Sequence, residues 1–142
     1  MLCIGDLVGR PYVAGGRDPE TGLDCWGLVR EVLRRQGVVL PAYGEHIWHD
    51  DSDSAEVAEQ LLAGAADWQP APIGPSARPG DVALIMLAGR PVHVGVLIAW
   101  PDFLHAYKGA GTVVIDRLTS PAWRHRCVGL YRHPALVAPV AA

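Results

Sequence analysis

The sequence has 142 residues, of which 50% are hydrophobic and 19% are charged, and its formal net charge is -3. This length suits one domain with a single core, and the composition excludes a disordered chain. No basic run indicates a nucleic-acid partner, and no apolar stretch reaches the roughly 18 residues that a membrane span needs. We therefore expect one domain over residues 1–133, a flexible tail over 134–142, and no membrane insertion.

The first residues and the cysteines bear on the cellular compartment. The N-terminus lacks the basic segment and apolar core of a secretory signal, which predicts synthesis in the cytoplasm without a signal peptide. Three cysteines with no C-x-x-C spacing argue against a disulfide framework and against a structural zinc site. His46 and His49 have H-x-x-H spacing but no matching second pair of ligands, so we expect no metal and no other cofactor.

The first half of the chain has the pattern of loops and helices. Residues 1–8 form either a short amphipathic helix or an extended segment, and a glycine-rich loop follows. An apolar stripe at helical spacing predicts a helix over 25–36, which Gly37 closes. Beyond an irregular loop over 41–53, a second stripe with a capping box predicts a helix over 54–63.

The second half of the chain changes to the period of strands. Four prolines between residues 68 and 80 exclude a helix or a central strand there. Short segments rich in Val, Ile and Leu then predict strands over 81–87, 92–99, 103–108, 112–116 and 127–132. Short connections favour antiparallel neighbours. The sequence therefore predicts an α+β domain whose N-terminal helices pack on an antiparallel sheet of about five strands.

Cys25 lies in the first turn of the predicted helix. A helix start offers unpaired N–H groups and a partial positive charge, which favour the thiolate, and the thiolate is the nucleophilic form of cysteine. A buried structural cysteine explains the same residue equally well, so the helix alone leaves both interpretations open. Asp24, the residue before it, either caps the helix or recognises a substrate.

Two histidines lie on consecutive predicted strands. His93 and Gly95 share one face of their strand, where Gly95 leaves space beside the imidazole. If the strands pair antiparallel, His93 and His105 lie on the same side of the sheet, and we expect the Cys25 helix to dock there. Cys25 would then be a nucleophile, His93 its base, and His105 the residue that orients the base. The alternative is that each histidine is a core residue with its hydrogen bonds satisfied.

The motifs follow one another in a specific order: D-C-W-G-L-V from Asp24, P-G-D ending at Asp81, H-V-G from His93, and then His105. In this order they resemble the NlpC-type cell-wall cysteine peptidases. The resemblance implies a papain-like fold and hydrolysis of an amide in the peptide stem of peptidoglycan, commonly the bond from D-glutamate to the diamino acid. It also implies that Cys25, His93 and His105 are catalytic and that Tyr12 lines the site near the oxyanion position.

The block D-C-W-G-L-V-R, with G-G-R-D-P before it, looks most like the phage-tail branch of that family, found in tail-tip proteins and gene transfer particles. This resemblance implies tail or baseplate partners, a place in the virion tail, and local opening of the target cell's wall during DNA delivery. Trp26 stands where many members have Ser, so it either lines the substrate site or anchors the helix in the core.

Two other functions fit the same residues. One is a tail-assembly protein that keeps a papain-like fold for packing and does not use the site. The other is an amidase or acyltransferase that acts on a substrate other than murein, because one fold supports several chemistries.

Overall fold

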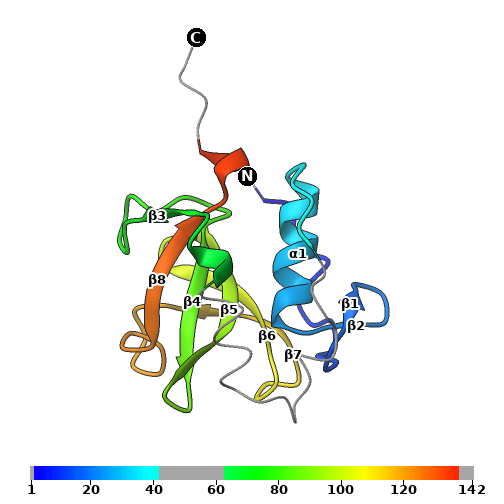
Figure 1. Ribbon diagram of the computed structural model, residues 1–142. Helices are drawn as coiled ribbons and strands as arrows, with labels where there is room; N and C mark the ends of the chain where they lie inside the picture. The colour runs from blue at the N-terminus through cyan, green and yellow to red at the C-terminus, as the bar shows by residue number, and fades with distance from the viewer. Residues whose placement is uncertain (1, 42–62, 138–142) are drawn as a thin grey trace.

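The computed structural model describes residues 2–41 and 63–137. Within these residues an α-helix packs on a six-stranded antiparallel sheet of order β3-β8-β4-β5-β6-β7 (Figure 1). Its strands are β3 (Gln69–Ala71), β4 (Val82–Leu87), β5 (Arg90–Ala99), β6 (Asp102–Tyr107), β7 (Thr112–Arg117) and β8 (Cys127–Arg132). The five predicted strands are confirmed within two residues at each end, and β3 adds a short edge strand in which Pro70 is tolerated.

Helix α1 (Cys25–Arg35) follows a two-stranded ribbon, β1 (Arg17–Asp18) and β2 (Gly22–Leu23). The helix forms because Asp24 caps its first turn and because its apolar stripe is buried against the sheet. Gly37, with φ of 85°, ends it in the left-handed conformation that glycine accepts. The predicted helix over 25–36 is therefore confirmed within one residue.

Several expectations fall on parts of the chain that the structure does not describe. The predicted helix over 54–63 and the loop over 41–53 lie outside the described residues, except for one end residue of each. The histidine pair at His46 and His49 also lies outside them. Among the helices of the described part, none is long and apolar enough to cross a membrane.

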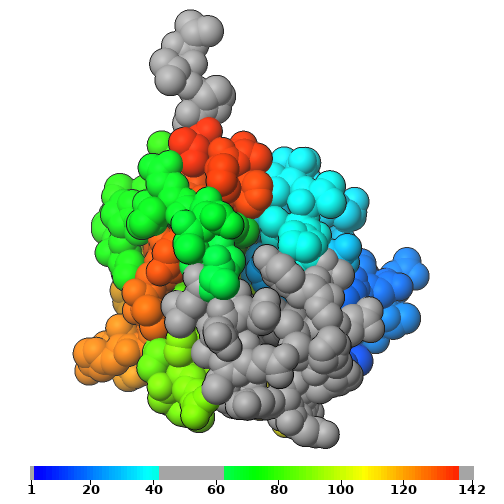
Figure 2. All heavy atoms as spheres, in the orientation of Figure 1, coloured from blue at the N-terminus to red at the C-terminus, as the bar shows by residue number. Residues whose placement is uncertain are grey.

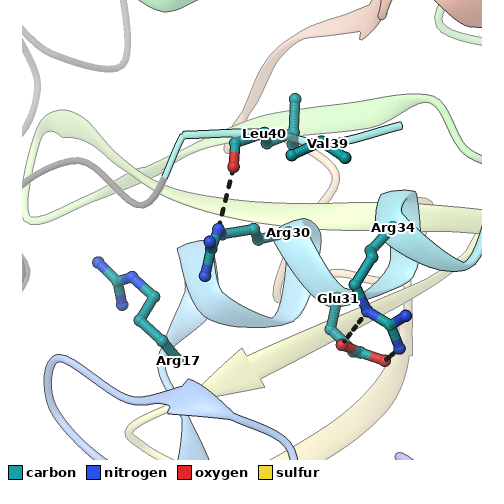
Figure 3. Close-up of a pocket in the computed structure, with 6 residues that line it drawn as sticks. All are labelled: Arg17, Arg30, Glu31, Arg34, Val39 and Leu40. Atoms are coloured by element: carbon teal, nitrogen blue, oxygen red, sulfur yellow. Dashed lines mark hydrogen bonds and ion pairs between the residues drawn. The ribbon is translucent and has the colours of Figure 1, made fainter. Parts of the chain in front are cut away.

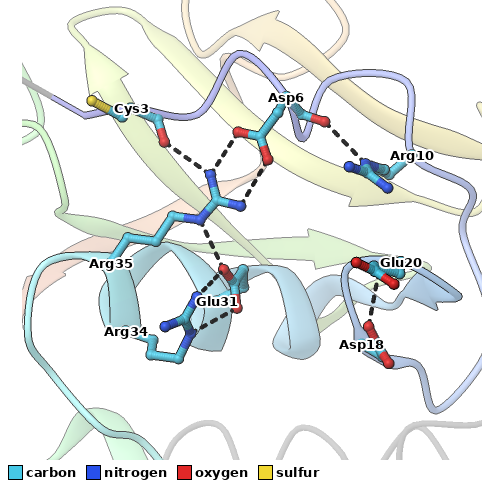
Figure 4. Close-up of polar contacts among 8 residues, drawn as sticks. All are labelled: Cys3, Asp6, Arg10, Asp18, Glu20, Glu31, Arg34 and Arg35. Carbon is cyan, nitrogen blue, oxygen red and sulfur yellow. Dashed lines mark hydrogen bonds and ion pairs between the residues drawn. The ribbon is translucent and has the colours of Figure 1, made fainter.

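The N-terminal segment is held against α1 by ion pairs. Residues 5–9 form turns rather than the short helix or extended segment of the prediction. Arg35 donates two hydrogen bonds to the Asp6 carboxylate, at 2.6 and 2.8 Å, and one to the Cys3 carbonyl (Figure 4). Glu31 accepts from Arg34 and Arg35, so one acidic side chain joins both arginines at the end of the helix.

Residues 134–136, which the sequence assigns to a flexible tail, form a short 3-10 helix (Pro134–Leu136). Leu136 packs against the core, and the His133 ring meets Trp68 edge-on at 5.0 Å. The space-filling view shows this red segment between the green residues before β4 and the cyan end of α1 (Figure 2). Residues 138–142 lie outside the described part of the chain.

The sheet has two apolar faces, which the alternation of side chains separates. On one face Val94 and Val96 of β5 and Leu104 of β6 belong to the core cluster that contains α1. On the other face Leu97 and Phe103 belong to a second cluster, which is closed by the segment after β7. This division decides where the histidines lie.

Candidate active site

Cys25 is the first residue of α1, and its side chain is 8% exposed. The backbone N–H of Val94 in β5 interacts with the Cys25 side chain, so the thiol meets the strand beside His93. The backbone N–H of Trp26 at the helix start also lowers the thiol pKa, as the sequence predicts. Burial outweighs it: together with the charge of Asp24, burial raises the pKa of Cys25 to about 12.

The start of the helix therefore does not by itself keep the pKa of Cys25 low in this structure. At neutral pH the buried Cys25 is a thiol, because the desolvation that disfavours its anion exceeds the help of the N–H groups. A nucleophile of this kind needs a base that takes its proton as it attacks.

Asp24 is the residue immediately before α1, and only 1% of its surface is exposed. Its Oδ1 accepts a hydrogen bond from the Gly27 N–H at 2.7 Å, and the Arg17 guanidinium lies 2.6 Å from the same oxygen. Burial raises the pKa of Asp24, and Arg17 acts in the opposite direction. The structure thus shows the capping role, while substrate recognition by Asp24 stays a prediction.

His93, His105 and Asp116 form a continuous hydrogen-bonded row across β5, β6 and β7. His93 Nε2 lies 2.7 Å from His105 Nδ1, and His105 Nε2 lies 2.8 Å from Asp116 Oδ2. Burial lowers the pKa of His93 to about 3, and the neighbouring His105 adds to the shift. Burial also lowers the pKa of His105, although Asp116 opposes it. Both imidazoles are therefore neutral at neutral pH.

The expectation that the two histidines lie on the same side of the sheet is confirmed, but the expected docking face is wrong. His93 pairs with Ile85 across β4 and β5, and Ile85 belongs to the core cluster on the face away from α1. Alternation places His105 with Phe103 on that face, where their rings lie 4.3 Å apart. The body of α1 thus packs on the face opposite the two histidines, while its first residue, Cys25, reaches the backbone N–H of Val94, the residue next to His93.

Aromatic rings enclose the histidine pair. The Tyr107 ring stacks on His105 at 5.4 Å, and the Trp123 ring meets His105 edge-on at 5.0 Å. Sequence reasoning missed both Trp123 and Asp116. The alternation of side chains along the strands could have indicated Asp116, because it pairs with Phe103 in the β6–β7 register and so shares the face of His105. Trp123 lies in an irregular segment, where periodicity carries no signal.

Tyr12 and Trp26 occupy different kinds of position. Tyr12 forms a bridge with Leu23 just before the helix and packs against the cluster that contains Cys25; its role at the oxyanion stays a prediction. Trp26 is buried, and its indole N–H donates to the Pro41 carbonyl at 2.9 Å. Trp26 thus serves as the core anchor of α1.

The segment that follows α1 is held to the helix by a second hydrogen bond. Arg30 donates to the Leu40 carbonyl at 3.0 Å, beside a cavity of about 180 Å³ (Figure 3).

A buried cysteine at the start of a helix, next to a strand that carries a hydrogen-bonded histidine, defines the class of papain-like cysteine peptidases. The chain belongs to the NlpC/P60 family, because the model of that family matches residues 9–132. Two curated relatives are 28% identical: the gamma-DL-glutamyl hydrolase of Bacillus subtilis, over 93% of this chain, and a murein DD-endopeptidase/murein LD-carboxypeptidase of Escherichia coli, over 85%. This chain spans only 28% and 54% of their respective lengths.

Solved structures confirm the papain-like α+β fold. An NLP/P60-family protein of Staphylococcus aureus, similar to a lipoprotein, matches 89% of this chain and 37% of its own, with a TM-score of 0.63 at 27% identity. The P60 domain of an antigen from M. avium subspecies paratuberculosis matches 91% of this chain and 88% of its own. Its TM-score is 0.60 at 23% identity, so this second likeness concerns the fold alone.

Proposed function

We propose that this domain is a cysteine endopeptidase that hydrolyses amide bonds in the peptide stem of peptidoglycan. The observation that carries the proposal is the position of Cys25 beside the strand of His93, whose ring is hydrogen-bonded to His105. Family membership supports the reaction class, and the murein endopeptidase among the relatives supports the substrate.

The proposed reaction has two halves. His93 takes the proton of the Cys25 thiol while the sulfur attacks the amide carbonyl carbon, and the backbone N–H of Cys25 helps to stabilise the oxyanion. His93 then gives the proton to the leaving amine, which departs and leaves a thioester on Cys25. Water attacks the thioester with His93 as base, and the carboxylic acid and free thiol are released. Because both groups begin neutral, proton transfer accompanies the attack.

The test is digestion of purified peptidoglycan and of synthetic stem peptides, followed by mass spectrometry of the products. The wild-type protein should release one new amine and one new carboxyl group at a single bond, and Cys25→Ala should abolish release. Cys127→Ala is the matched control, since Cys127 lies in β8, which β4 separates from the strand of His93, and should be dispensable. Full activity of Cys25→Ala would overturn the proposal.

We further propose that the domain acts in the tail of a phage or phage-like particle and opens the wall of the target cell. Only the sequence pattern around Gly15, Asp24 and Trp26 supports this placement. Particles that carry Cys25→Ala should assemble normally but deliver DNA poorly. Normal delivery would favour the structural tail protein with an unused site. Turnover of simple amides or acyl thioesters but not of stem peptides would favour the non-murein amidase or acyltransferase.

A further inference from the structure

The row from His93 through His105 to Asp116 contains two short hydrogen bonds, and each bond needs one proton. His105 uses both ring nitrogens: Nδ1 faces His93 Nε2 at 2.7 Å, and Nε2 faces Asp116 Oδ2 at 2.8 Å. An ionised carboxylate can only accept a hydrogen bond, so Asp116 requires a proton on His105 Nε2.

This requirement sets the protonation of the whole row. A neutral imidazole carries one proton, so His105 Nδ1 is left as an acceptor. His93 must then donate from its Nε2, and its own lone pair is left at Nδ1. In the opposite arrangement His105 would donate to His93, the His93 proton would move to Nδ1, and the ring would have no basic nitrogen outside the row.

We propose that Asp116 is a positioning residue: it holds His105 in the Nε2–H form and thereby directs the basic lone pair of His93 to Nδ1. The inference rests on the proposed function in one respect: it takes His93 to be the base of the reaction. It makes Asp116 the outer member of the row, and the base atom of the reaction becomes Nδ1 of His93.

The surroundings of the row support this arrangement. His105 is fully buried among Phe103, Tyr107 and Trp123, whose ring centroids lie 4.3 to 5.4 Å from its own. Burial of this kind favours the neutral imidazole, which has one proton to place.

Asp116, by contrast, is 38% exposed, and it lines an open pocket of about 500 Å³ together with Tyr107, Trp123 and Arg126. The carboxylate thus keeps part of its contact with water, while its Oδ2 faces His105 Nε2 at 2.8 Å. A buried ring between two partners and a carboxylate oxygen at the outer end of the row are the geometry that the proposed tautomer needs.

Long-range ¹H–¹⁵N spectra of the full chain labelled at histidine nitrogens test the proposal directly. In the wild-type protein at neutral pH, His93 and His105 should each carry the proton on Nε2 and have an unprotonated Nδ1. Asp116→Asn and Asp116→Ala remove the charged acceptor, and at least one of them should move proton density to Nδ1 of both rings. A wild-type His105 protonated on Nδ1, or an unchanged tautomer in both variants, would overturn the proposal.

Kinetics supply a second readout. Asp116→Asn should lower kcat about 10- to 100-fold with little change in KM, because orientation of the base is lost while Cys25 and the start of α1 are unchanged. Asp116→Glu, which keeps the carboxylate, should recover part of that loss. Asp102→Asn is the matched control: this aspartate on β6 is also half exposed and pairs with Arg117 at 3.7 Å. An Asp116→Asn rate equal to that of Asp102→Asn would count against the proposal.

The two proposals fail differently. If the wild-type protein cleaves no stem peptide but the spectra show both rings protonated on Nε2, the proposed function fails and the role of Asp116 in setting the tautomer stands. If cleavage depends on Cys25 and the tautomers do not depend on Asp116, the proposed function stands and the proposed role of Asp116 fails.

Discussion

The guanidinium of Arg17 and the carboxylate of Asp24 form a buried ion pair immediately before the helix that begins at Cys25. Arg17 Nη1 lies 2.6 Å from Asp24 Oδ1, and the two side chains are 8% and 1% exposed. The same oxygen caps α1 through the Gly27 N–H. One carboxylate therefore positions the helix start and also places a negative charge beside the Cys25 sulfur, where it raises the thiol pKa.

Asp24→Asn should lower the pKa of Cys25 and reduce stability. An asparagine can still cap the helix, but the charge that disfavours the thiolate is gone. Removing one partner of a buried pair costs about 3–5 kcal/mol. The pH dependence of iodoacetamide labelling measures the thiol pKa, and urea unfolding measures the stability. The exposed Asp67 provides the control variant Asp67→Asn, which should change neither. A raised Cys25 pKa in Asp24→Asn would contradict this account.

Gly95→Ala should disturb the histidine row. A methyl group at Gly95 would lie 2.8 Å from Phe103 Cδ2 and 3.1 Å from His105 Cβ. Phe103 is fully buried, so we expect a loss of about 1–3 kcal/mol in urea unfolding. Gly74→Ala is the control, because a methyl group there meets nothing within 4 Å. Equal unfolding midpoints for the two variants would show that the strand absorbs the clash.

Stability should fall as the pH drops below about 6.5. Burial lowers the pKa of His93 from 6.5 to about 3, so between these values the unfolded chain binds a proton that the folded chain does not. The contribution of His93 is fully present above pH 6.5 and decreases by about 1.4 kcal/mol per pH unit below it. From pH 7 to pH 5 this amounts to about 2 kcal/mol, and His105 acts in the same direction.

Urea unfolding at several pH values measures this effect. His93→Asn should flatten the acid limb of the profile, whereas His125→Asn, at an exposed histidine, should leave its slope unchanged. A His93→Asn profile as steep as that of the wild type would mean that other groups cause the acid loss.

The P-G-D motif should prove to be a stability element. Asp81 is 1% exposed and accepts two hydrogen bonds from Arg132, each 2.8 Å long. It joins the start of β4 to the end of β8, so Asp81→Asn should cost about 3–5 kcal/mol in urea unfolding. Asp102→Asn breaks an exposed pair with Arg117 and should cost less than about 1 kcal/mol. Similar losses in the two variants would contradict the importance of burial.

Much of the fold was predictable because the signals are local. The stripe of α1 and the alternation of β4 to β8 repeat over neighbouring residues, so periodicity alone located these elements. The shared side of His93 and His105 also followed from two adjacent strands joined by a short turn, whereas their contact depends on the register, which only the structure shows. The side of the sheet on which α1 packs did not follow, because both faces of β5 and β6 are apolar.

The sequence by itself thus determined the helix that begins at Cys25, the strands that carry His93 and His105, and the ordered motifs of the NlpC/P60 family. Only the tertiary structure decided that the Cys25 thiol stays protonated and that Asp116 completes the histidine row. The physical reason is that desolvation and hydrogen-bond partners depend on what segments distant in sequence bring to one place. Local periodicity does not contain that information.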